Sequence, residues 1–407
     1  MRLGMILLTF VALCSAAFGQ SVLPAPDLVG PALDQHPMVV AARARVGAAE
    51  AEARALAKGP HETTLSTTIV NRTVDLEGRY TEYDAQLSRA MRLPGKARLD
   101  RAIGAHGVDA ARNRAEDARH QAALLLADIW WDWLEAEAEA RIDAQLVDAH
   151  ARLARAMQRR EALGDAARLD SDQADAALAT AQVALEQSQG RSRRAKARLQ
   201  TQFPGLALPP QAPDVPDPVR PDDGWEPYRA LILRNSHEIG SARADAARSL
   251  RMADRARRDK LADPVLGVRV FSERDGMERG GGLVVTLPFG GGHRSALADR
   301  AVGEASAAQA DLQLVEANVA EVAATDIAEA DYRHSAWQRA RAARAAQDAA
   351  LAKMRRAHDL GEVGLMDLLT AERLAADALR AESAARMAAH RADTRVKIDS
   401  HALWLAD

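Results

Sequence analysis

Two aspartates occupy matching places behind glycine-bearing turns, and they are the clearest candidates for chemistry in this sequence. Asp170 follows Gly164 by six residues, and Asp367 follows Gly361 by six residues. Each begins a predicted helix, where a carboxylate ordinarily caps free N–H groups and pairs with the positive end of the helix dipole. The first expectation for both residues is therefore helix capping.

Catalytic and cofactor-binding patterns are missing from the sequence. Gly95-Lys96 is followed by Ala97 instead of Ser or Thr, and Ala90 stands where a phosphate loop requires glycine. The eleven histidines are scattered, without an HExxH motif or a pair at i, i+4. The only cysteine is Cys14, which excludes disulfides and cysteine nucleophiles elsewhere. We therefore expect no enzyme, no cofactor and no tight metal site.

Composition indicates long, closely packed helices. Aromatic residues make up only 4% of the 407 residues, whereas Ala, Leu, Arg and Glu are abundant and 27% of residues are charged. A globular core of this size would normally hold more aromatic rings. The formal net charge is −3, so a nucleic-acid partner is not supported.

An export signal is expected at the N-terminus. Arg2 precedes the apolar run Gly4 to Leu13, and Ala17-Phe18-Gly19 predicts cleavage after Gly19. A retained anchor and lipidation at Cys14 are the alternatives. No later stretch has the ~18 uninterrupted apolar residues of a spanning helix. The exported chain then either stays in the periplasm or crosses a membrane as a β-barrel, whose strands need only about 9–11 residues.

The chain is expected to be built twice. Three pairs of matching segments recur in the same order, separated by 194 to 200 residues: Ala42-Arg43-Ala44 with Ala242-Arg243-Ala244, Leu93-Pro94 with Leu287-Pro288, and Gly164 with Gly361. Eight prolines between Phe203 and Pro227 predict an extended connector. The expected organisation is a signal peptide (1–19), a first repeat (20–202), the connector (203–227) and a second repeat (228–407).

Each repeat is expected to contain a helix, a β-hairpin and two further helices. The first repeat should have helices at 36–58, 96–163 and 168–201, with a hairpin at about 62–93 whose strands flank a loop at 71–79. The second should have helices at 226–261, 295–360 and 365–403, with a hairpin at about 264–287. The stretch 96–163 contains no proline and would be about 100 Å long as a helix. Such a helix needs partners along its whole length, so we expect antiparallel helical hairpins with a small β part. Trp130, Trp131 and Trp133 should pack between helices or against the connector.

The predicted strands alternate apolar and polar residues, which gives each hairpin two unlike faces. Four strands are too few to close a barrel, but three chains would supply twelve, and closure is required in lipid because an open edge cannot persist there. The alternative is a small periplasmic sheet that caps a helical bundle. Few aromatic residues are available for the girdles that such barrels usually carry. The residues expected to face lipid are Tyr83, Leu87, Leu266, Val268, Leu283 and Val285.

The layout resembles the TolC family of outer-membrane efflux proteins across essentially the whole exported chain. The resemblance rests on the segment from Leu87-Ser88 through Met91 to Arg98, on Gly164 to Asp170, and on Gly361 to Leu369. Leu93-Pro94-Gly95-Lys96 with Arg98 is most similar to the CzcC-like branch that serves heavy-metal efflux. The family forms homotrimers in which a twelve-stranded transmembrane β-barrel continues as a helical tunnel through the periplasm. Departures are the short chain, the few aromatics and Thr370, where some members carry a further acidic residue.

The resemblance implies an outer-membrane exit duct that works passively with a periplasmic adaptor and an inner-membrane pump of the RND type, with heavy-metal cations as possible cargo. It also implies a constriction near the turns, where rings of Asp367 and Asp170 would attract cations or pair with Arg355, Arg356 or Arg373. The turns themselves would dock the adaptor, unless they are ordinary interhelical turns with Leu169 and Met366 in the core. The docking residues expected are Gly164, Ala166, Leu169, Gly361, Val363, Gly364 and Met366.

Two other functions remain open. An adaptor or coiled-coil scaffold without a pore would have one helical hairpin between two halves of a lipoyl-like domain, whereas this sequence predicts two hairpins with strands between helices. An amphipathic protein that lies on a lipid surface would need a basic polar helix face opposite Trp or Phe, and the helices here carry mixed charge.

Overall fold

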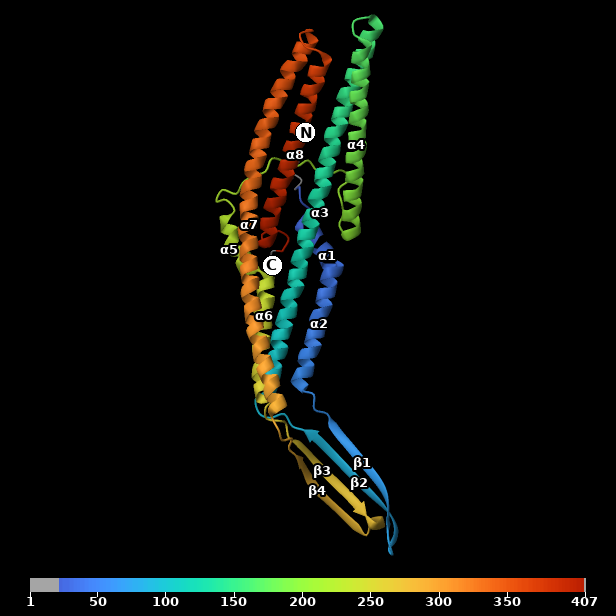
Figure 1. The fold of residues 1–407 in the computed structure, drawn as a ribbon, viewed down its shortest axis with the longest axis vertical. Helices are drawn as coiled ribbons and strands as arrows, with labels where there is room; N and C mark the ends of the chain where they lie inside the picture. The colour runs from blue at the N-terminus through green and yellow to red at the C-terminus, as the bar shows by residue number, and fades with distance from the viewer. Residues whose placement is uncertain (1–21, 406–407) are drawn as a thin grey trace, which may run out of the picture.

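The computed structural model describes residues 22–405 and shows an elongated molecule (Figure 1). Helices run lengthwise and form most of the body. A four-stranded sheet extends from one end, and two helix–turn–helix tips form the other end. The expected mainly α fold with a small β part is confirmed.

Two very long helices span the helical body. Helix α3 runs from Lys96 to Leu163 and α7 from Gly292 to Asp359, and each contains 68 residues. Neither sequence contains a proline, so no backbone hydrogen bond is lost along either helix. Each is about 100 Å long at 1.5 Å per residue.

Shorter helices stack end to end along each long helix. Helix α2 (Pro37–Lys58) and helix α4 (Arg168–Gln202) pack on successive parts of α3, and α6 (His237–Arg258) and α8 (Leu365–Asp399) do the same on α7 (Figure 1). In both pairs the helix near the sheet has 22 residues and the helix near the tip has 35. The expected end-to-end arrangement is therefore observed.

Because the short helices do not cover the full length of the long ones, other segments pack at the middle of the molecule. Helix α1 (Pro26–Asp34) contacts α3, and α5 (Glu226–Asn235) contacts α7. The connector contributes to the same core through Leu206 and Val215, which pack with the tryptophans of α3. Burial of these rings between helices and connector matches the expectation from sequence.

The three α3 tryptophans attach different parts of the chain to one place. The indole N–H of Trp130 donates to the carbonyl oxygen of Val22 at 3.0 Å, and that of Trp131 donates to Thr394 Oγ1 on α8 at 3.1 Å. Trp133 is fully buried. Trp404 donates in turn to the carbonyl oxygen of Pro24 at 3.1 Å. Both ends of the described chain are thus held at the middle of the body.

Two helical expectations were wrong. The single helix expected at 226–261 is broken into α5 and α6, because Ser236 adopts an extended conformation and its Oγ accepts a hydrogen bond from Ile239 N at 3.2 Å. This is an N-cap, which begins a new helix. Helix α1 was not expected at all, although Pro26 at its first position is a common helix start.

The sheet is antiparallel with strands in the order β1-β2-β3-β4, in which β1 is Thr63–Val74, β2 Gly78–Ala90, β3 Val265–Glu273 and β4 Glu278–Thr286. A short 3₁₀ turn, η1 (Arg274–Gly276), joins the last two. The loop expected at 71–79 was too long, because β1 continues to Val74. Thr81 Oγ1 donates to Asn71 Oδ1 at 3.1 Å across this region, so cross-strand pairing outweighs the polar local composition.

Two expectations concern targeting and membranes. The predicted signal peptide (1–19), including Cys14, lies outside the described residues. Among residues 22–405, no helix combines the length and the apolar character needed to cross a membrane.

A buried lysine fixes the junction between helices and sheet. Lys96, at the first position of α3, is 1% exposed. Its ammonium group donates to the carbonyl oxygen of Leu261 and to Asp263 Oδ1, both at 2.7 Å, and lies 2.9 Å from Asp259. Asp263 also accepts from Leu93 N at 3.0 Å and lies 2.8 Å from His61. The first repeat is therefore bonded to the residues that lead into β3 of the second.

The charge of Asp263 is strongly stabilised by these contacts. Partial burial would raise the pKa of its carboxyl group, but hydrogen bonds from Lys96, His61 and the backbone N–H of Leu93 outweigh burial and lower the pKa to about 2. The group therefore stays ionised at any pH near neutrality.

A second set of contacts at the junction involves Arg92. Its guanidinium donates to the carbonyl oxygens of Leu56, Ala57 and Lys58 at 2.9, 2.7 and 3.1 Å, which satisfies the end of α2. It also donates to Asp100 at 2.8 Å, and Asp100 accepts from Arg255 of α6 at 2.7 Å. Both repeats are thus joined again one turn into α3.

We expect Lys96→Met to destabilise the protein by about 2–4 kcal/mol, because it leaves the half-buried Asp263 carboxylate without its main counter-charge. The measurement is unfolding in detergent, followed by circular dichroism at pH 7. Lys260→Met, at an exposed lysine nearby, should change stability by less than ~0.5 kcal/mol. Equal stabilities of the two variants would contradict the role assigned to Lys96.

Candidate functional site

One face of the sheet is exposed and mostly apolar, with Arg89 at the end nearest the helices and Arg79 and Arg279 at the far end. The strand register aligns Leu65, Leu87, Val268 and Leu283 in one row across all four strands. Leu266 and Val285 pair in a neighbouring row, and Tyr83 pairs with Ile69. Because side chains alternate strictly along a strand, all six residues expected to face lipid lie on this one face. Their exposed fractions range from 46% for Leu266 to 85% for Leu283.

The opposite face of the sheet is polar and charged. It carries Glu82, Asp84 and Gln86 on β2, and Arg72 on β1 pairs with Glu82 at 2.6 Å. Arg269 on β3 forms an ion pair with Asp84. Glu82 and Asp84 are thus paired within the sheet, whereas the apolar face has no cover in this single chain. The sheet is therefore built to separate an apolar environment from an aqueous one.

The two tips repeat one turn geometry. Gly164 and Gly361 have φ angles of 81° and 75°, a left-handed conformation that favours glycine at helix ends. Asp165 N donates to the carbonyl oxygen of Arg160 at 2.8 Å, and Glu362 N donates to that of Ala357 at 2.9 Å. Both bonds span five residues, as in a Schellman turn.

Apolar side chains project from these turns. Leu169 is 63% exposed and Met366 is 54% exposed. The alternative in which they lie in the core is therefore wrong for the single chain. Leu365 and Leu368 are buried with Ala154 and Met157, so the second tip packs on the first hairpin just below the turns. Gly164 and Gly364 are exposed as well, and Ala166 and Val363 are half-buried.

The two aspartates differ in their local contacts. Asp170 Oδ2 accepts a hydrogen bond from Ala167 N at 3.3 Å, so it caps α4 as expected. Asp367 is exposed, and within the described chain it makes no hydrogen bond or ion pair. Arg355, expected as a counter-charge, pairs with Glu372 at 3.1 Å. In a single chain Asp367 therefore makes no capping hydrogen bond, although it lies in the first turn of α8.

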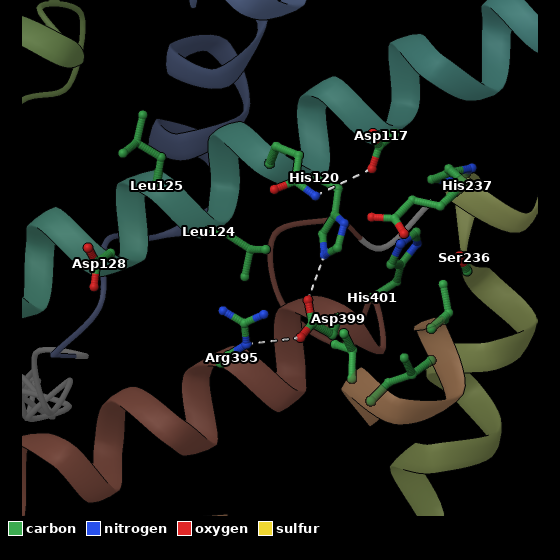
Figure 2. Close-up of a pocket in the computed structure, with 15 residues that line it drawn as sticks. Asp117, His120, Leu124, Leu125, Asp128, Ser236, His237, Arg395, Asp399 and His401 are labelled. Atoms are coloured by element: carbon green, nitrogen blue, oxygen red, sulfur yellow. Dashed lines mark hydrogen bonds and ion pairs between the residues drawn. The ribbon is translucent and has the colours of Figure 1, made fainter. Parts of the chain in front are cut away.

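A cavity of about 400 Å³, lined by charged and apolar side chains, lies at the middle of the body where α3, α6, α7 and α8 meet (Figure 2). His120 Nε2 on α3 lies 2.8 Å from Asp399 Oδ1 on α8. Arg395 Nε lies 3.0 Å from each carboxylate oxygen of Asp326 on α7 and 3.5 Å from Asp399 Oδ2. The network joins three helices from both repeats.

Burial and neighbouring groups shift the pKa values of the carboxyl groups in and around this network. Burial, followed by a hydrogen bond to Asp399, raises the pKa of Asp326 to about 7, although Arg395 opposes the shift. Burial would also raise the pKa of Asp399, but hydrogen bonds from His120 and Asp326 lower it overall. The pKa of Glu238, on α6, is raised by burial and by Asp117. One carboxyl group of the Asp326–Asp399 pair thus keeps its proton far above the usual pH range of an aspartate and releases it near neutral pH.

The central cavity was not expected from sequence. Its histidines, His120, His237 and His401, are far apart in the chain and come together only through folding (Figure 2). Within residues 22–405, no group of three or more His, Cys, Asp or Glu side chains is placed to hold a metal ion. The charged lining of the cavity belongs to an ionisable network between helices.

The fold defined by these features is that of outer-membrane channels. The chain matches the structure of the outer-membrane channel OprN with a TM-score of 0.79 and 20% identity, over 93% of this chain and 90% of that one. It matches the outer-membrane protein VceC of Vibrio cholerae with a TM-score of 0.73 and 17% identity, over 92% and 95% of the two chains.

A third match is CusC, whose structures concern folding and transmembrane channel formation. The TM-score is 0.78 with 15% identity, over 92% of this chain and 91% of that one. No protein-family model and no curated protein matched the sequence. These likenesses confirm the fold expected from the resemblance to TolC-family proteins, while the CzcC-like branch stays a prediction.

The raised pKa of Asp326 predicts a pH dependence of stability. Its folded pKa of about 7 lies above the unfolded value of 3.8, so its contribution to stability is complete below pH 3.8 and is lost as pH rises through 7. Asp326→Asn cannot ionise and should be more stable than wild type at pH 8, by less than the ~4 kcal/mol that about three pKa units represent, because the ion pair with Arg395 is lost as well.

The measurement is unfolding by circular dichroism between pH 5 and pH 8. Asp311→Asn, at an exposed position of the same helix, should keep the wild-type slope. An Asp326→Asn slope equal to that of wild type would assign the pH dependence to Glu238 or to another cavity group.

Proposed function

We propose that this protein is the outer-membrane exit duct of a tripartite efflux system and that it acts as a homotrimer. The single observation that carries the proposal is the two-faced sheet at the end of the long helical hairpins. An exposed apolar face that runs across all four strands is unfavourable in water. It is suited to contact with the hydrocarbon of a membrane. The fold shared with outer-membrane channels supports the same conclusion.

Assembly of several copies is favoured by the edges of the sheet, and the resemblance to TolC-family proteins sets their number at three. Strands β1 and β4 are its outer strands, and each has one side without a partner in the single chain. In lipid such an edge carries unsatisfied backbone groups, each of which costs several kcal/mol. Pairing β4 of one copy with β1 of the next closes a barrel of twelve strands when three copies assemble. The apolar face then meets lipid, and the polar face lines the lumen.

The helical hairpins would continue the barrel as a tunnel through the periplasm. Three copies bring together six tips, with exposed Leu169 and Met366 available to a partner. A periplasmic adaptor that joins the duct to an RND-type inner-membrane pump is the partner we propose for the seven tip-turn residues. The alternative that this chain is itself an adaptor is disfavoured. An adaptor would have one helical hairpin between two halves of a lipoyl-like domain, whereas this chain has two helical hairpins and a sheet at one end.

The cargo is not encoded in the motif that suggested heavy metals. Lys96, the charged residue of Leu93-Pro94-Gly95-Lys96, is buried in the junction and does not line a passage. Selection of cargo is then left to the pump, and the duct conducts passively. Heavy-metal cations stay a candidate cargo on the basis of the resemblance alone.

Val268→Arg tests the lipid-facing assignment. Val268 lies in the apolar row across all four strands, and an arginine near the bilayer midplane costs about 2–4 kcal/mol. We expect loss of trimer from the outer-membrane fraction, measured by cross-linking and mass analysis in detergent. Thr68→Arg places the same side chain on the polar face opposite Asp84 and should assemble normally.

A detergent-free, fully helical monomer of the wild-type protein would overturn the proposed function.

Asp367→Ala tests the proposed constriction. Three copies of this unpaired carboxylate around one axis would repel one another or bind cations. We expect Asp367→Ala to raise single-channel conductance in planar bilayers and to weaken block by divalent cations, with little change in unfolding temperature. Asp170→Ala should instead lose about 1 kcal/mol of stability through its cap. Wild-type conductance and block in Asp367→Ala would remove Asp367 from the gate.

A further inference from the structure

An aromatic ring on the polar face of the sheet lies over a glycine. Phe271 on β3 and Gly280 on β4 are directly paired in the register, so both belong to the polar face. A Cβ atom added to Gly280 would lie 2.6 Å from Cε1 and 3.2 Å from Cε2 of the Phe271 ring. The ring therefore occupies the space directly above Gly280. Strand side chains ordinarily stand roughly perpendicular to the sheet, but this one lies across the neighbouring strand.

Other residues hold the ring in this position. The guanidinium carbon of Arg269, two residues earlier on the same face, lies 5.7 Å from the ring centroid in a cation–π contact. Arg269 is itself held by its ion pair with Asp84 on β2. The ring is thus confined between a fixed cation on its own strand and the open backbone of Gly280 on the next.

The neighbouring glycines have different surroundings. A Cβ atom at Gly282, on the same face two residues further along β4, would meet no atom within 4 Å. Gly281 is on the opposite face, where its Cβ would lie 3.4 Å from the carbonyl oxygen of Arg269. Of the three consecutive glycines, Gly280 alone makes room for a ring.

We propose that Gly280 keeps the Phe271 ring flat against the barrel wall and thereby sets the width of the lumen at this level. This inference rests on the proposed function, in which the polar face lines the lumen of a trimer. Any side chain at position 280 would lift the ring from the wall. Three rings would then point toward the axis at the same height, and they would narrow the passage for any solute.

The test is a set of variants measured as single channels in planar bilayers in potassium chloride. Gly280→Ala should lower the conductance measurably, because the raised rings add a narrow level in series with the tip and conduction depends on the pore diameter. Gly282→Ala adds the same methyl group to the same face and should conduct like wild type. Phe271→Ala should change conductance little, since the flat ring occupies little of the lumen.

The double variant Phe271→Ala with Gly280→Ala distinguishes the ring from the methyl group. Its conductance should return to the level of Phe271→Ala, because no ring is left to lift. Wild-type conductance in Gly280→Ala, or a double variant that conducts as poorly as Gly280→Ala, would overturn the inference. If Gly280→Ala fails to assemble, the double variant should still assemble, and its failure would also overturn the inference. Absence of channels from the wild-type protein would instead refute the proposed function.

Discussion

The length of the two long helices is the constraint on which the remaining structure depends. A helix of about 100 Å cannot be buried by one partner of ordinary length, so each long helix is covered by two shorter helices in succession. The gaps between the short helices fall near the middle of the molecule. There the chain places α1, α5, the connector and its tryptophan core. Segments that look like linkers in sequence are in this way structural parts of the helical body.

Polar contacts between the repeats are concentrated on α3. Along this helix, Lys96 bonds to Asp263, Asp100 to Arg255 and His120 to Asp399. Near the tip, Asp143 is 2% exposed and accepts from Arg380 Nη2 at 2.7 Å. Ala-rich helix faces pack with little preference for one axial position, whereas buried ionic contacts are satisfied in only one. We infer that these contacts fix the register of the two hairpins, a use of buried polar groups known from coiled coils.

The sequence predicted the features that depend on the local pattern of residues, namely helix bounds and strand faces. Pro94-Gly95 and Gly164 gave the bounds of α3 at Lys96 and Leu163, and alternation along the strands placed all six expected apolar residues on one face. It failed where a distant partner decides. Nothing near Asp326 indicates a raised pKa, because Asp399 and Arg395 are about 70 residues away. Lys96 was noticed only as part of a motif, since its burial depends on Asp263, 167 residues later. The part of β1 after Val70 likewise forms because it pairs with β2.

The long helices also act mechanically as levers. The junction at Lys96 and Arg92 lies at one end of α3, and the turn at Gly164 lies at the other. A tilt of one degree about the junction displaces the far end by about 2 Å over a length of about 100 Å. Small angular strain at the sheet is thus converted into translation at the tip. The buried hydrogen bonds around the Lys96 ammonium group, together with the helix packing along α3, therefore limit how far the distant turns can travel.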